Sequence, residues 1–170
     1  SIAAVTDAGS PGIADPGYPL VRAAIEAGVP VVSVPGPSAV IAALQVSGLP
    51  TDAFAFMGFL PVKSGARRSR LEEWSRRRET IVAFESPHRI GRTLDDLEAV
   101  WGERPIALAR ELTKTFEEVL RGSAREVRAD LFSATLGLGD EVEPTIVAHQ
   151  RANAVPVAGV EEARVPIERG

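Results

Sequence analysis

The residues best suited to bind a ligand lie in the glycine- and proline-rich stretch from Val5 to Tyr18, which reads VTDAGSPGIADPGY. Asp7, Ser10 and Asp15 carry short polar side chains that can bind backbone groups or a ligand. The glycines between them permit positive φ and let a ligand approach the backbone closely. Open α/β sheets bind ligands beyond the carboxyl ends of their strands, and this stretch follows the apolar run 2–5. It therefore predicts a ligand-binding loop, with an ordinary loop held by Asx turns as the alternative.

Three more polar corners follow apolar runs: PGPS at 35–38, ESPHR at 85–89 and RELTK at 110–114. The carboxyl ends of parallel strands meet at one edge of a sheet. If the preceding runs form parallel strands, these corners gather at that edge and face a common ligand.

The elements that must position the corners alternate between apolar runs and amphipathic segments, a pattern typical of an α/β fold with a parallel sheet. We expect strands at 2–5, 31–34, 54–59, 80–84, 106–109, 116–120 and 145–148, and helices at 20–27, 37–44, 64–78, 87–101 and 123–132. A break at 48–52 divides an amino-terminal α/β unit (1–50) from a carboxyl-terminal α/β lobe (53–150), and 151–170 reads as a tail without a pattern.

Three local signals refine these expectations. Gly58 within its strand predicts a bulge. Ser86 followed by Pro87 is typical of a helix start, and Ser123 with Glu126 forms a capping box.

Composition sets limits on the class of protein. The chain has 170 residues, 45% hydrophobic and 25% charged, with a net charge of -4, which argues against a protein that coats nucleic acid over its whole surface. The absence of cysteine excludes disulfides and thiolate sites and fits a cytoplasmic setting. Prolines interrupt the uncharged stretch 29–50, so no membrane span is expected. With His88 and His149 as the sole histidines, we expect no metal site.

A basic run at 63–78 is the best candidate for contacts to phosphates, with a solvated helix face as the alternative. The residues that we expect to bind RNA are Lys63, Arg67, Arg68, Arg70 and, at the start of a later helix, Arg89.

Five segments, in order, resemble one known family: DAGSPGIADPGY, PGPSAVIAAL, GLPTDAFAFMGFLP, FESPHR and ALARELTKTFEEVLRG. They are similar to the ribosomal RNA small subunit methyltransferase I group of the tetrapyrrole methylase family, over roughly residues 2–128. The resemblance implies a two-lobed fold with S-adenosylmethionine bound between the lobes, and a homodimer. It also implies 2′-O-methylation of a cytidine ribose in small-subunit ribosomal RNA. The family begins with a strand and loop for which this chain has no counterpart before Ser1, so the amino-terminal half of the first lobe is expected to be missing. The segment GDEVEPTIVAHQ also departs from the family's usual last strand.

The resemblance also implies which residues contact the methyl donor: Ala8, Gly9, Ser10, Ile13, Ser38, Ala39, Glu85 and Leu112. A ribose hydroxyl is a poor nucleophile, so a nearby base or charge would help, and the candidates are Glu85, Lys114 and Glu117. Glu85 is equally suited to bind backbone near a helix start.

Two rival functions stay open. One is a methyltransferase of the same fold that acts on a tetrapyrrole or another small molecule, against which the basic run and the ESPHR and ARELTK segments favour RNA. The other is a catalytically silent module, if the absent half-lobe prevents donor binding.

Overall fold

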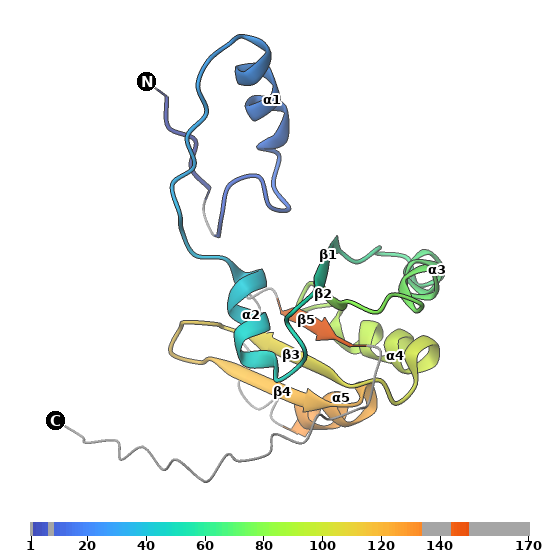
Figure 1. Ribbon diagram of the computed structural model, residues 1–170. Helices are drawn as coiled ribbons and strands as arrows, with labels where there is room; N and C mark the ends of the chain where they lie inside the picture. Colours follow the sequence, from blue (N-terminus) through green and yellow to red (C-terminus); the bar gives the residue numbers. More distant parts are fainter. Residues whose placement is uncertain (1, 7–8, 134–143, 150–170) are drawn as a thin grey trace, which may run out of the picture.

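The computed structural model describes residues 2–6, 9–133 and 144–149, and a five-stranded sheet is its centre (Figure 1). In spatial order the strands are β1 (Phe54–Phe59), β2 (Thr80–Phe84), β5 (Thr145–Ala148), β3 (Ile106–Arg110) and β4 (Glu118–Gly122). β1 and β2 are parallel, whereas β5 runs antiparallel to both β2 and β3, and β4 runs antiparallel to β3. The sheet is therefore mixed and not parallel throughout. β1, β2 and β3 nevertheless point the same way, so their carboxyl ends share one edge.

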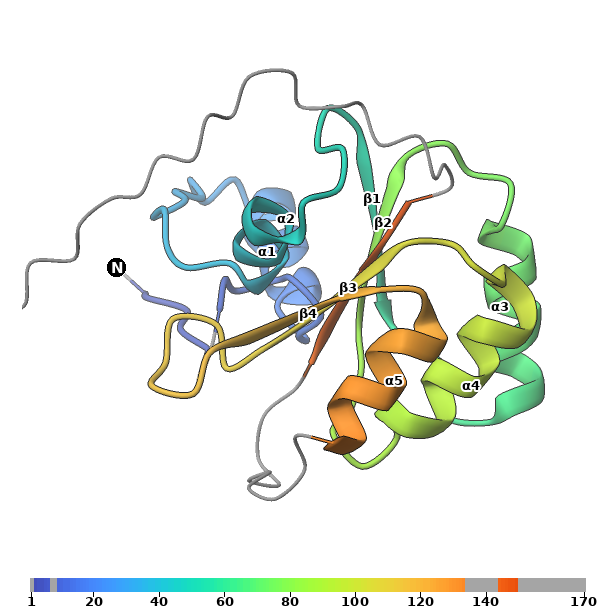
Figure 2. The same cartoon turned by 90° about the horizontal axis from the view of Figure 1, so that it is seen from below.

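Helices cover both faces of the sheet (Figure 2). α3 (Ser64–Trp74), α4 (Ile90–Trp101) and α5 (Ala124–Ser133) lie on one face, and α2 (Ala39–Ser47) lies on the other. α1 (Tyr18–Glu26) buries none of its residues and stands away from the sheet.

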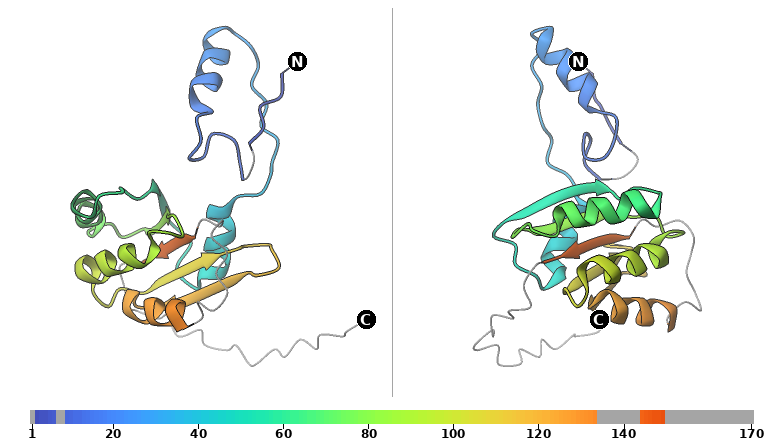
Figure 3. Two further views of the ribbon diagram at one scale, coloured as in Figure 1. Left: turned by 180° about the vertical axis from the view of Figure 1, so that it is seen from behind. Right: turned by 90° about the vertical axis from the view of Figure 1, so that its right-hand side faces the viewer.

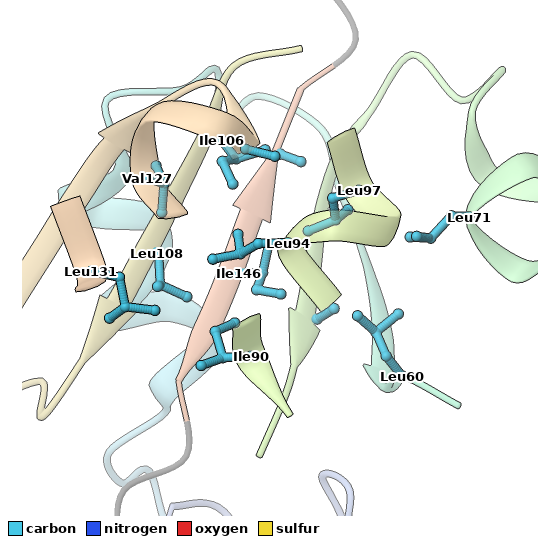
Figure 4. Packing of buried hydrophobic residues seen from close by; sticks show 13 residues of the cluster. Leu60, Leu71, Ile90, Leu94, Leu97, Ile106, Leu108, Val127, Leu131 and Ile146 are labelled. Carbon is cyan, nitrogen blue, oxygen red and sulfur yellow. The ribbon is translucent and has the colours of Figure 1, made fainter. Parts of the chain in front are cut away.

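The core is divided by the sheet because successive strand residues point to opposite faces. In β3, Leu108 packs toward the three-helix face, whereas Ala107 and Ala109 pack toward α2. Figure 4 shows the larger cluster, in which leucines of α3, α4 and α5 meet Ile146 of β5. Each fully buried leucine contributes about 1.5–3 kcal/mol relative to an exposed one.

Of the three local sequence signals, the bulge and the capping box are confirmed and the helix start is wrong. The register of β1 with β2 shifts between Phe56 and Gly58, and Gly58 has φ +76°, which is the expected bulge. The Glu126 carboxylate accepts hydrogen bonds from the backbone and side chain of Ser123 at 2.8 and 2.9 Å, as the capping box predicted. The predicted helix start at Ser86 and Pro87 is wrong, because these residues form a turn and α4 begins only at Ile90.

The strands expected at 2–5 and 31–34 do not form, which corrects the sequence prediction. Ile2 is 94% exposed and Val34 is 85% exposed. Both views of Figure 3 show α1 and the described segments on either side of it extending away from the sheet. A strand is stabilised by pairing with a neighbour, and none of the described strands lies beside these two segments.

Several element boundaries also differ from the expectation. The helix predicted to reach residue 78 ends at Trp74, and the strand predicted at 116–120 occupies Glu118–Gly122. Residues 151–170 lie outside the described part of the chain. The division into units 1–50 and 53–150 stays a prediction, although Val40 and Leu44 of α2 pack directly against the sheet of the second unit.

Candidate functional site

The corner after β2 is built around a buried carboxylate. The Glu85 side chain is 0% exposed. One of its oxygens accepts a hydrogen bond from the Ser86 backbone N–H at 2.7 Å and pairs with Arg89 at 2.5 Å. The other accepts a hydrogen bond from the Thr93 hydroxyl of α4 at 2.6 Å. These partners offset the cost of burying the charge, so Glu85 fastens the end of β2 to α4.

The corner after β3 is a strained hairpin loop between β3 and β4. Arg110 and Glu118 pair across its base at 2.5 Å. Glu111 and Thr113 have positive φ angles of 53° and 67°, which is unfavourable for a β-branched residue such as Thr113. The Glu117 carboxylate accepts the Thr113 backbone N–H at 2.6 Å and so closes the loop. Strain of this kind is often found at functional sites.

Two side chains of this loop point in different directions. Lys114 is exposed, with its ammonium 3.8 Å from the Glu111 carboxylate. Leu112 packs against the cluster that contains Val40, in the first turn of α2. Leu112 therefore lies on the α2 side of the sheet, whereas Lys114 is exposed to solvent.

The glycine- and proline-rich stretch at 5–18 is joined to the corner at 35–38. The Ser10 hydroxyl donates to the Pro37 carbonyl at 2.8 Å. The Asp15 carboxylate accepts the backbone N–H groups of Gly12 and Gly17 at 2.7 and 2.8 Å, the kind of turn that the sequence offered as the alternative to a ligand loop. Ser38 is the N-cap of α2 and accepts the Ile41 N–H at 3.5 Å.

The structure thus brings together some of the predicted donor-binding residues and separates others. Ser10 and Ser38 lie at the start of α2, through the Ser10–Pro37 hydrogen bond, and Leu112 packs on the same side of the sheet as α2. Glu85 pairs with α4, on the opposite face of the sheet. The ends of β2 and β3 are separated by β5, a distance of about 10 Å at two strand spacings.

The other predicted contacts are placed as follows. Gly9 has φ +73°, Ile13 is exposed, and Ala39 is the first residue of α2. Ala8, with Asp7, lies outside the described residues.

The basic run is not a uniform charged face. Arg67 is only 2% exposed and binds Asp96 of α4, with a hydrogen bond from Nε at 2.8 Å. Its Nη1 donates to the carbonyls of Pro61 and Val62, both at 3.2 Å. Arg70 pairs with Glu73 at 2.8 Å. Arg67 therefore joins two helices and is not accessible to a phosphate.

Asp96 is the residue that sequence reasoning missed. Besides Arg67, it accepts hydrogen bonds from Ser64 at 2.9 Å and from Arg68 at 2.5 Å. Burial acts to raise the pKa of Asp96, but the hydrogen bonds from Arg68, Ser64 and Arg67 outweigh it and hold that pKa below its usual range.

Two kinds of feature are absent from the described residues. None of the helices in this part of the chain is long and apolar enough to cross a bilayer. Among the same residues, no three acidic or histidine side chains gather as metal ligands would.

Comparisons with known proteins agree with this architecture. The model of the tetrapyrrole (corrin/porphyrin) methylases matches residues 1–128. The ribosomal RNA small subunit methyltransferase I of Halalkalibacterium halodurans is 44% identical over 153 residues, which are 85% of this chain and 53% of that protein. The protein of the same name from Mycobacterium tuberculosis is 47% identical over 163 residues, 95% of this chain and 57% of that protein. The chain thus spans about half the length of the curated relatives it matches.

The fold is also similar to a solved structure. The uroporphyrin-III-C-methyltransferase of Thermus thermophilus matches with a TM-score of 0.54 and 23% identity, covering 84% of this chain and 61% of that one. At this identity the likeness concerns the fold alone.

Proposed function

The chain belongs to the tetrapyrrole methylase family, and on that premise we propose that it carries part of an S-adenosylmethionine-dependent methyltransferase acting on small-subunit ribosomal RNA. The finer proposal is that the methyl group goes to the ribose 2′-hydroxyl of a cytidine. The observation that supports it most is the 44% and 47% identity to relatives named ribosomal RNA small subunit methyltransferase I. The model of the tetrapyrrole methylase family matches residues 1–128, which include all four corners.

The group around the start of α2 fits a nucleoside-containing methyl donor. Ser38 and Ser10 supply hydroxyls, and Leu112 supplies an apolar side chain on the same side of the sheet. Gly9 and Gly12 have positive φ and open space where a side chain would stand, so a ligand can approach their backbone. We propose that these residues hold S-adenosylmethionine, and that a homodimer completes the site.

When bound, the donor supplies a methyl group on a sulfonium sulfur, and catalysis consists mainly of alignment and exclusion of water. Glu85 is fully engaged inside the protein, so we assign it the positioning of the β2 corner. Lys114 is an exposed cation on the corner after β3 and is suited to contact the substrate. Glu117 uses one carboxylate oxygen to close the hairpin loop, and we propose that the other accepts the proton of the attacking hydroxyl.

The test is a methylation assay. The chain is incubated with small ribosomal subunits that lack the modification and with donor labelled in its methyl group, and the digested RNA is analysed for 2′-O-methylcytidine. Labelled 2′-O-methylcytidine is expected. Label in a different nucleoside would contradict the cytidine assignment, and label transferred only to a tetrapyrrole acceptor would favour the small-molecule function.

A further inference from the structure

Three cations from two helices lie on one side of the α3–α4 pair. Arg68 of α3 reaches across to Asp96 of α4 and keeps 50% of its side chain exposed. Lys63 is the N-cap of α3, directly before Ser64, which also bonds to Asp96. Arg92 is exposed and precedes Asp96 by four residues on α4, so the two side chains are neighbours on the helix surface.

This group carries unbalanced positive charge. Asp96 is shared between Arg67 and Arg68, so it neutralises only one of them. Within the described part of the chain, neither Lys63 nor Arg92 has a carboxylate within 4 Å. The surface therefore holds a local excess of about three positive charges, although the whole chain has a net charge of -4.

Several other exposed arginines pair with carboxylates, whereas Arg76, Arg78 and Arg121 have no carboxylate within 4 Å in the described part of the chain. On the α5 side of α4, Arg125 pairs with Glu98 at 2.6 Å and Arg128 pairs with Asp95 at 2.8 Å. Toward the carboxyl end of α3, Arg70 pairs with Glu73 and lies over the Trp74 ring. A polyanion would consequently be attracted more strongly to the Lys63 side than to the paired arginines on the α5 side of α4.

We propose that Lys63, Arg68 and Arg92 form one surface that binds the phosphate backbone of the substrate RNA; this inference rests on the proposed function. The proposed surface includes Arg92, which lies outside the basic run at 63–78. It excludes Arg67, which belongs to that run but is buried. The surface borders the edge where the candidate methyl-transfer residues lie, since Lys63 follows β1 closely and Arg92 lies in the first turn of the helix after β2. RNA held there is placed to offer a ribose at the adjoining corners.

The test compares two double variants that remove the same charge. Lys63→Gln with Arg92→Gln changes the proposed surface, and Arg125→Gln with Arg128→Gln changes the balanced face of α5. Binding of each to unmethylated small ribosomal subunits is measured between roughly 50 and 200 mM salt, and binding of S-adenosylhomocysteine is measured alongside. For the first variant we expect binding to weaken roughly 2- to 30-fold and the slope of log affinity against log salt to fall by about 1.5. The second variant should change neither quantity, and donor binding should be the same in both.

The outcomes separate this inference from the function on which it rests. If the unchanged chain binds the subunits and both double variants bind equally well, the surface assignment is wrong while the proposed function stands. If the unchanged chain binds S-adenosylhomocysteine but not the subunits, the RNA substrate is wrong, and the surface assignment falls with it.

Discussion

Replacing Asp96 with alanine should destabilise the fold far more than replacing its neighbour Asp95. Asp96 is buried and balances Arg67, which is 2% exposed, whereas Asp95 is 51% exposed and pairs with Arg128 at the surface. Removing one partner of a buried ion pair typically costs about 3–5 kcal/mol. Arg67 keeps its two hydrogen bonds to the carbonyls of Pro61 and Val62, so we expect the lower part of that range, about 3 kcal/mol. For Asp95→Ala we expect less than about 1 kcal/mol.

Urea unfolding followed by circular dichroism at pH 7 measures both differences. Thermal unfolding should agree, with Tm lowered by roughly 6–12 °C for Asp96→Ala. Because the pKa of Asp96 is depressed in the folded state, its contribution is complete above its unfolded pKa, about 3.9. It is lost as the pH falls through the lower folded pKa. Equal effects of Asp95→Ala and Asp96→Ala at pH 7 would refute the reasoning that the buried cluster joins α3 to α4.

Three other perturbations test separate parts of the molecule. Ser38→Trp should abolish S-adenosylhomocysteine binding in calorimetry by filling the space at the start of α2, whereas Ser33→Trp in the exposed segment should not; retained affinity in the first would remove this loop from the site. Lys114→Ala should lower the rate of methyl transfer without changing donor affinity, and an unchanged rate would show that Lys114 does not contact the substrate. Glu126→Ala should lower Tm at pH 7, and this loss should shrink as the pH is lowered, because hydrogen bonds from Ser123 depress the pKa of Glu126 and its contribution is lost as the pH falls through that depressed pKa; a loss of Tm that stays constant as the pH falls would contradict this.

The strands that sequence predicted correctly are those with partners. Thr80–Phe84, Ile106–Arg110 and Thr145–Ala148 are short apolar runs that lie in the middle of the sheet, with a neighbour on each side. The runs 2–5 and 31–34 have the same composition but form no strand. Apolar composition indicates that a segment can be buried, whereas a strand also requires a neighbour, which a local pattern does not specify.

The charged residues were harder to predict because their roles depend on distant partners. Arg67 and Arg68 are adjacent in sequence and look equivalent, yet one is buried and the other is half exposed. The difference comes from Asp96, 29 residues after Arg67. Glu85 was likewise predicted to flank the donor, and only the contact with Thr93 reveals which face of the sheet it occupies.

Calorimetric titration of this chain with S-adenosylhomocysteine tests the central claim most directly, because it asks whether the group around Ser10, Ser38 and Leu112 holds the methyl donor. We expect saturable binding of one ligand per site, roughly micromolar in affinity, that is lost in Ser38→Trp. Binding that persists unchanged in Ser38→Trp, or no binding by the unchanged chain, would contradict the assignment of the donor site to these residues.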